Sequence, residues 1–160
     1  MAYTHTKPGE KLQITFTHSM PYEWSIGLYG SIFFQEIKQN GRFIGIRCNG
    51  CGKVYVPPRR VCGPCFRELT ELVPLSHTGV ITAFSIVNYP FIDPNSGFQR
   101  PIPYTYGYIR LDGADSIFSH IINETDLSKI KVGMKVRAVF KDKKDMQGNI
   151  QDILHFDIIE

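Results

Sequence analysis

The chain has 160 residues and a mass of 18.3 kDa, which fits one ordinary domain or two small ones and excludes two large domains. Hydrophobic residues make up 42% of the sequence and charged residues 21%, a composition typical of a folded protein. The formal charge of +3 is too small to indicate a nucleic-acid partner by itself. No stretch approaches the roughly 18 apolar residues of a membrane span, and the first residues lack the layout of a signal peptide. We therefore expect a cytoplasmic protein.

Residues 1–41 are predicted to form an extended arm followed by one helix. Apolar and polar residues alternate loosely before Pro21, which indicates extended backbone. From residue 22 to residue 39 the apolar positions recur mostly at spacings of three and four, which predicts an amphipathic helix. Gly41 is expected to end this helix, because glycine readily adopts the left-handed conformation of a helix stop.

Residues 42–75 contain the strongest chemical signal in the sequence. All four cysteines lie in two C-x-x-C pairs, Cys48 with Cys51 and Cys62 with Cys65. Two-residue spacing lets each pair present two thiolates to one ion, so the pattern predicts a tetrahedral four-thiolate site in a zinc ribbon. Zinc is the expected metal, although the same geometry holds iron in rubredoxin-like sites. Disulfide bonds are an alternative that a reducing cytosol disfavours.

The predicted metal site is structural, and the sequence offers no catalytic residue elsewhere. A site with four protein ligands leaves no position for water, so the metal should hold the fold and not catalyse hydrolysis. Committing every thiol to metal also removes cysteine as a nucleophile. The five histidines are scattered without a Ser-His-Asp motif or a His-x-x-x-His pair, and the glycines form no nucleotide-binding loop. No catalytic residue is therefore assigned to this chain.

Residues 76–160 are predicted to form a small all-β domain. Short runs rich in Val, Ile, Tyr and Phe indicate five strands, at residues 79–87, 104–111, 116–122, 135–141 and 150–158. Five strands favour a small closed barrel, because a sandwich usually needs about seven. With one helical turn expected at residues 123–130, the order resembles an OB-fold. The predicted fold is thus mainly β, with an N-terminal helix and a four-cysteine zinc ribbon followed by a five-stranded OB-fold barrel.

A long loop at residues 89–103 joins the first two predicted strands of the barrel. It is too apolar for a plain hairpin, since it carries Tyr89, Phe91, Ile92, Phe98 and Ile102. These side chains are expected to be buried either on the barrel itself or on a partner protein.

The motifs taken together resemble one family. The sequence contains Ile44-Gly-Ile-Arg-Cys-Asn-Gly-Cys-Gly52, Pro57-Pro-Arg59, Cys62-Gly-Pro-Cys65, Leu75-Ser76, Gly79-Val80, and Pro103-Tyr104 through Leu111-Asp112. Over residues 27–158 the chain resembles the rubredoxin-like zinc-ribbon plus OB-fold proteins that accompany thiolases and related acyl-CoA enzymes. The resemblance implies a small non-catalytic subunit beside a thiolase-like, aldolase-like or hydratase-like partner. Such a subunit stabilises the partner and helps to hold the CoA thioester.

The resemblance suggests which residues contact the CoA thioester or the partner. The candidate cations for the CoA phosphates or an acyl carboxylate are Arg59, Arg60 and Arg100. The candidate apolar walls are Phe91, Tyr104 and Tyr106. Each set has a plainer interpretation: the two adjacent arginines are equally consistent with a solvated ribbon edge, and the two tyrosines share one strand face and would also suit barrel packing.

Two other functions stay open from the sequence. A nucleic-acid-binding protein would explain both modules, because OB-folds stack bases on strand aromatics. However, Lys141, Lys143 and Lys144 are interleaved with acidic residues instead of forming a phosphate-binding cluster. An independent metalloenzyme would need an open metal site or a catalytic constellation. The leading expectation is a hetero-oligomeric accessory subunit of a thiolase-type acyl-CoA C-acyltransferase complex, active in acyl-CoA degradation or synthesis.

Overall fold

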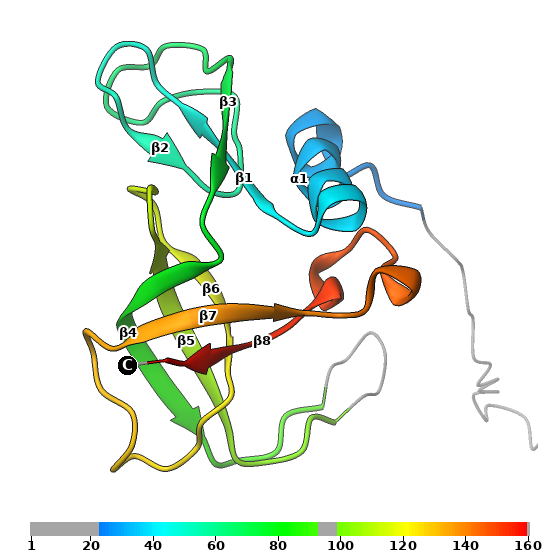
Figure 1. The fold of residues 1–160 in the computed structure, drawn as a ribbon, viewed down its shortest axis with the longest axis vertical. Coiled ribbons are helices and arrows are strands. Elements are labelled where there is room, and N and C mark those ends of the chain that lie inside the picture. The colour runs from blue at the N-terminus through cyan, green and yellow to red at the C-terminus, as the bar shows by residue number, and fades with distance from the viewer. Residues whose placement is uncertain (1–22, 93–98, 160) are drawn as a thin grey trace, which may run out of the picture.

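The structure is a computed structural model that describes residues 23–92 and 99–159, and the predicted N-terminal arm lies outside these residues. A helix and a small sheet lie at one end of a barrel (Figure 1). The first elements are α1 (Gly27–Asn40), β1 (Phe43–Arg47), β2 (Val54–Tyr55) and β3 (Glu71–Leu75). The barrel strands are β4 (Thr78–Val87), β5 (Tyr104–Leu111), β6 (Phe118–Ile122), β7 (Lys135–Phe140) and β8 (Ile153–Ile158). Two short 3-10 helices, η1 (Lys143–Asp145) and η2 (Ile150–Asp152), connect β7 to β8.

Helix α1 ends where the sequence predicts and begins later. Gly41 adopts a left-handed φ of 61°, and its backbone N–H donates to the Ile37 carbonyl at 2.8 Å. The helix starts at Gly27 and not at residue 22. Gly27 has a φ of 72°, outside the helical region, so regular helical backbone does not continue from it toward the N-terminus. Phe33 and Ile37 form its buried face. No helix in the described part of the chain is long and apolar enough to cross a membrane.

The cysteine segment folds as a three-stranded antiparallel sheet in the order β2-β1-β3. The apolar run at residues 42–47 predicts a short strand directly after the helix, and β1 confirms it. Strands β2 and β3 were not predicted. A two-residue strand is too short to show alternation in a sequence. Strand β3 contains Pro74, which is compatible with β3 only because β3 is an edge strand of this sheet.

The second half of the chain forms a closed five-stranded barrel in the order β4-β5-β6-β8-β7. All neighbouring strands are antiparallel except β6 and β8, which pair in parallel at Ile122 and Phe156. The mainly β fold class, with its helix, four-cysteine cluster and barrel, is therefore confirmed.

Three local predictions in the barrel differ from the structure. The third strand begins at Phe118 and not at residue 116, because Ser116 bonds to the ribbon. The last strand begins at Ile153, since residues 150–152 form η2. The helical turn predicted at residues 123–130 is a single hydrogen-bonded turn, in which the Lys129 N–H donates to the Asp126 carbonyl at 3.0 Å, and it does not extend into a helix. The Asp126 carboxylate also accepts bonds from the Ser128 N–H and hydroxyl at 2.9 and 2.7 Å.

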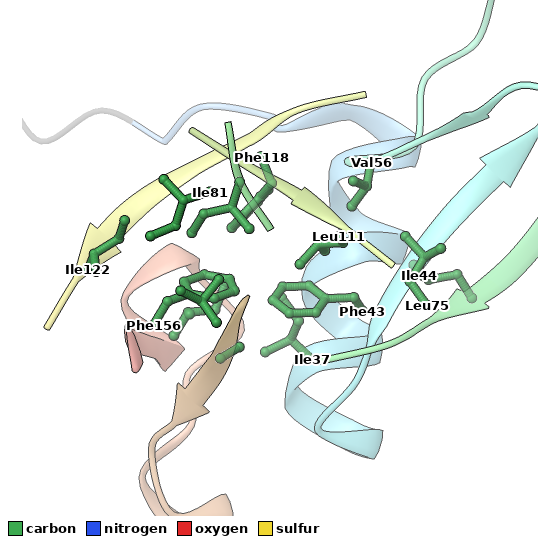
Figure 2. Packing of buried hydrophobic residues seen from close by; sticks show 14 of the residues in the cluster. Ile37, Phe43, Ile44, Val56, Leu75, Ile81, Leu111, Phe118, Ile122 and Phe156 are labelled. Carbon is green, nitrogen blue, oxygen red and sulfur yellow. The ribbon is translucent and has the colours of Figure 1, made fainter. Parts of the chain in front are cut away.

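One hydrophobic core joins the helix, the ribbon and the barrel, as Figure 2 shows. The Phe43 ring at its centre lies 6.2 Å from Phe33 of α1 and 5.5 Å from Phe118 and 6.2 Å from Phe156 of the barrel. The core thus runs across both predicted domain boundaries, after residues 41 and 75. The helix, the ribbon and the barrel therefore share one core.

Asp152 fixes the connection between β7 and β8. Its side chain is 0% exposed and accepts the backbone N–H groups of Gln147, Gly148 and Asn149 at 2.9, 2.6 and 3.2 Å. Burial alone would raise the pKa of the Asp152 carboxyl, but these three donors outweigh it and hold the pKa below its ordinary value. The buried carboxylate therefore holds three consecutive backbone N–H groups of this loop in place.

We expect Asp152→Asn to lower the free energy of unfolding by about 1.5–3 kcal/mol at neutral pH, because charge-assisted hydrogen bonds are lost. The folded-state pKa lies below the ordinary value of 3.8, so this stabilisation is complete above that pH and is lost as the pH falls through the folded pKa. Urea unfolding of both proteins across this pH range measures the effect. Asp142→Asn, at an exposed position nearby, is the control, and equal stability of Asp152→Asn and the parent at neutral pH would contradict the prediction.

Candidate metal centre and ligand groove

Two similar turns of the ribbon position the four cysteines. In the first turn, Cys48 N–H donates to the Lys53 carbonyl and Gly52 N–H donates to the Cys48 carbonyl, both at 2.8 Å. In the second, Cys62 N–H donates to Arg67 and Phe66 N–H donates to Cys62, both at 2.9 Å. Gly52 and Phe66 occupy the same place in their turns, and both have a positive φ, 75° and 54°. The two C-x-x-C pairs are therefore presented by matching backbone geometry from opposite sides.

The four sulfur atoms form one cluster. All four Sγ atoms lie within 4.8 Å of one another, and the Sγ atoms of Cys51 and Cys62 are 3.6 Å apart. Sulfurs bound tetrahedrally to zinc at about 2.3 Å would be separated by about 3.8 Å, so the spacing fits such a site. Each of the four is a free cysteine. The donor set is the soft, all-thiolate type that suits zinc or iron.

The electrostatics of the cluster favour a bound cation. A hydrogen bond with Tyr55 lowers the pKa of Cys62 to about 6. A hydrogen bond with Cys51, together with burial, raises the pKa of Cys65 to about 12. Thiolates this close repel one another. Without a counter-charge, the four cysteines therefore cannot all be deprotonated at neutral pH. A divalent cation would offset that repulsion and hold four thiolates together.

The structure divides the six predicted ligand or partner contacts among three places. Arg59 and Arg60 lie on the ribbon, where the Arg60 Nε donates to Glu68 at 3.2 Å. Phe91 lies beyond the end of β4 and is 56% exposed. Arg100, Tyr104 and Tyr106 come together on the barrel, where all three line one groove.

The groove has a volume of about 530 Å³, within the range of small-molecule sites. It lies over β5, β6, the start of β8 and the η2 loop, and the Arg100 guanidinium lies 5.5 Å from the centre of the Tyr104 ring. Its lining residues are Arg100, Tyr104, Tyr106, Ser119, His120, Ile121, Lys141, Ile150, Gln151, Ile153 and Leu154. An adjacent hollow of about 380 Å³ shares Arg100 and Tyr104 with it and extends the groove toward Glu124.

Sequence reasoning missed the groove residues other than Arg100, Tyr104 and Tyr106, and two of those it missed, Lys141 and His120, bear on the charge of the groove. In the sequence, Lys141 is one of three lysines interleaved with acidic residues, a pattern typical of a solvated surface. In the structure it lies before η1 begins and lines the groove. His120 has the spacing of two from Phe118 and Ile122 that marks a buried strand face, which is the signal that could have found it. It is 8% exposed, and its Nε2 lies 3.5 Å from the Ile150 carbonyl.

His120 contributes a neutral ring to the groove. Burial lowers the pKa of the imidazole, with the nearby Arg100 charge acting in the same direction and the Ile150 carbonyl opposing them. The ring stacks on Phe118 with centroids 6.1 Å apart, and its Nδ1 has no hydrogen-bond partner within the described residues. The charge at the groove at neutral pH therefore comes from Arg100 and Lys141. The described residues that line the groove include no carboxylate.

The long loop between β4 and β5 is apolar on its described surface. Tyr89, Phe91 and Ile92 are all exposed, so these three are not buried on their own barrel, which was one of the two expectations for this loop. Ile102 is also exposed, and Phe98 lies outside the described residues. Ile92 and Gln99 form an antiparallel bridge at the base of this loop.

Comparisons with known proteins agree with the modules of the structure. Residues 35–71 match the family described as the rubredoxin-like zinc ribbon domain of ChsH2. Residues 72–141 match the C-terminal OB-fold domain of ChsH2. The second match stops before β8, which the structure shows to be the strand that pairs with both β6 and β7.

Curated relatives cover most of this chain. A DUF35 domain-containing scaffold protein of Methanocaldococcus jannaschii is 32% identical over 113 residues, which are 70% of this chain and 77% of the relative. The benzoylsuccinyl-CoA thiolase subunit BbsA of Thauera aromatica is 32% identical over 118 residues, 72% of this chain and 69% of the relative.

Solved structures share the fold. A chain of the Ltp2-ChsH2(DUF35) aldolase superposes with a TM-score of 0.59 at 19% identity, covering 85% of this chain and 98% of that one. A DUF35 family protein of Sulfolobus solfataricus superposes with a TM-score of 0.59 at 21% identity, covering 83% and 87%. With its four-cysteine ribbon, its closed barrel and these relatives, the chain belongs to the DUF35 family of ChsH2-type zinc-ribbon and OB-fold proteins, to which the thiolase subunit BbsA is also similar.

Proposed function

We propose that this chain is a non-catalytic, cytoplasmic accessory subunit of a thiolase-type acyl-CoA C-acyltransferase complex. It would stabilise the catalytic subunit and help to bind the CoA thioester. The similar proteins support this proposal, since one is a thiolase subunit and one a scaffold protein, and a structural neighbour comes from an aldolase. The partner, of thiolase or aldolase type, would carry the catalytic groups, because all four thiols of this chain are grouped in the ribbon.

We assign one structural zinc ion to Cys48, Cys51, Cys62 and Cys65, a donor set that would also accept iron. The spacing of the four sulfur atoms fits a tetrahedral metal site. A divalent cation would also offset the repulsion between the thiolates. The ion would supply folding free energy, since four protein ligands leave no position for a substrate or a water. Its contribution is to hold the two cysteine turns together against the barrel.

The observation that carries the ligand-binding part of the proposal is the groove on the barrel. CoA carries phosphates, a base with a π face and a flexible apolar arm. Arg100 and Lys141 offer two cations for the phosphates, while Tyr104, Tyr106 and Leu154 offer apolar and aromatic surface beside them. Arg59 and Arg60 stay predicted contacts that would require a ligand or partner reaching the ribbon.

The exposed loop supports a protein partner. Tyr89, Phe91 and Ile92 form an apolar surface at the end of β4, and Leu127 is exposed on the turn after β6. Aromatic side chains such as Tyr89 and Phe91 are enriched at the centres of protein interfaces. Covering them with the catalytic subunit would remove the apolar area from water and would seat that subunit next to Arg100, which follows the same loop.

Native mass spectrometry of the chain purified from its own cell tests the proposed complex. We expect a hetero-oligomer with a thiolase-sized subunit and one metal ion for each copy of this chain. Phe91→Ser should weaken the complex, because it removes apolar area from the interface, whereas Leu154→Ser, on the groove, should leave assembly intact. A partner-free protein that binds single-stranded DNA with a steep salt dependence would contradict the proposal and favour the nucleic-acid alternative.

Metal removal tests the zinc assignment. Cys51→Ser and Cys62→Ser should each lose the metal and unfold the ribbon, because metal binding and folding are coupled in such sites. Elemental analysis measures zinc per chain, and hydrogen exchange of residues 43–75 measures ribbon folding. Lys53→Ser, an exposed substitution within the same ribbon, should change neither. Full metal content in both cysteine variants would contradict a four-thiolate site.

Groove binding is tested by neutralising its two cations. We expect Arg100→Ala with Lys141→Ala to weaken CoA binding to the assembled complex by about tenfold or more, since charge-assisted hydrogen bonds are lost. Isothermal titration of the complex with CoA measures the affinity. Lys143→Ala with Lys144→Ala removes the same charge from η1, outside the groove, and should leave the affinity unchanged. An equal loss in both double variants would indicate only a general electrostatic effect and contradict the groove assignment.

A further inference from the structure

Tyr55 lies beside the sulfur cluster. It is the second residue of β2, and its neighbours Val54 and Val56 belong to the large core, while Tyr55 packs with Cys48, Cys62 and other residues of a separate small cluster. Its side chain is buried, and its hydroxyl oxygen lies 3.2 Å from the Cys62 Sγ. The tyrosine is thus built into the metal site without being one of its ligands.

The chemistry of a metal-bound sulfur fixes the direction of this hydrogen bond. A thiol bound to zinc or iron is deprotonated and has no hydrogen to donate. The Tyr55 hydroxyl must then donate to the Cys62 sulfur. Because Cys62 is fully buried, water cannot replace this donor.

Arg59 covers the tyrosine from the outside. Its guanidinium carbon lies 3.6 Å from the centre of the Tyr55 ring, a stacked cation–π contact. The same side chain reaches the second cysteine turn, since a β-carbon built at Gly63 would lie 3.4 Å from the Arg59 Nη2. Arg59 therefore spans the gap between the tyrosine and the residue that follows Cys62.

We propose that Tyr55 and Arg59 are positioning residues of the metal site: Tyr55 donates a hydrogen bond to the Cys62 thiolate, and Arg59 holds the Tyr55 ring against it. The pair strengthens metal binding and makes the Cys62 ligand different from the other three. This inference rests on the four-thiolate assignment and is independent of the acyl-CoA function. It gives Arg59 a role within the ribbon that requires no CoA phosphate.

The test uses the full chain loaded with zinc and a competing chromophoric chelator at constant neutral pH. We expect Tyr55→Phe, which removes only the hydroxyl, to lower zinc affinity by about tenfold, the lower end of the effect of outer-shell substitutions. Arg59→Met, which keeps an unbranched apolar chain over the ring, should give a smaller loss. In the iron-loaded protein, Tyr55→Phe should shift the reduction potential to a more negative value, because hydrogen bonds to the sulfurs stabilise the reduced state.

Tyr108→Phe is the matched control, since it removes a hydroxyl from an exposed tyrosine on β5 and should change neither measurement. Near-ultraviolet circular dichroism of each zinc-loaded variant reports whether the fold is retained. Parent-like zinc affinity and iron potential in Tyr55→Phe would overturn the inference while leaving the zinc assignment standing. Failure of the parent chain to take up zinc or iron would overturn both.

Discussion

The attachment of β2 to the turn between β5 and β6 is the contact on which the rest of the structure depends. Val54 N–H donates to the Asp115 carboxylate, and Asp115 N–H donates back to the Val54 carbonyl, both at 2.8 Å. The Ser116 hydroxyl accepts from Val56 N–H at 2.7 Å and donates to the Val56 carbonyl at 2.9 Å. A two-residue strand thereby has partners on both edges, β1 on one side and the barrel on the other. Without this attachment the ribbon would rely on its share of the common core, because its own buried cluster is small.

This strand also divides the interior. Because successive side chains of a strand point to opposite faces, Val54 and Val56 enter the core of the barrel and Tyr55 enters the cysteine cluster. The metal centre and the barrel are therefore adjacent along one strand and separated by its backbone. The ribbon contacts the barrel through β2 and through Phe43 of β1, so a metal ion at the proposed site would support the barrel as well as the ribbon.

Much of this arrangement could be predicted from the sequence, where a local pattern carries the information. The cysteine spacing predicted the cluster, Gly41 the helix end, and alternation the five barrel strands, because each depends on neighbours in the chain. What could not be predicted depends on contacts distant in sequence. Strand β2 is bound by residues 115 and 116 on the edge opposite β1, and His120 of β6 meets Ile150 of η2 at the groove. From the sequence, Arg59, Arg60 and Arg100 were predicted together because all three are cations. In the structure, Arg59 and Arg60 lie on the ribbon, whereas Arg100 lies at the groove.

The proposed partner interface and the proposed CoA groove share one segment of chain. The loop from β4 to β5 begins with the exposed Tyr89 and Phe91, returns through the bridge between Ile92 and Gln99, and then delivers Arg100 to the groove. Among the described residues, the Arg100 guanidinium has a long contact to the Tyr104 ring, with 5.5 Å between them, and the loop from β4 to β5 leads directly into Arg100. In the proposed complex, a catalytic subunit seated on this loop would fix Arg100 and lower the entropy lost when a phosphate binds. The groove would then bind CoA more tightly in the complex than in the isolated chain, which is how a subunit without catalytic residues could contribute to the partner's reaction.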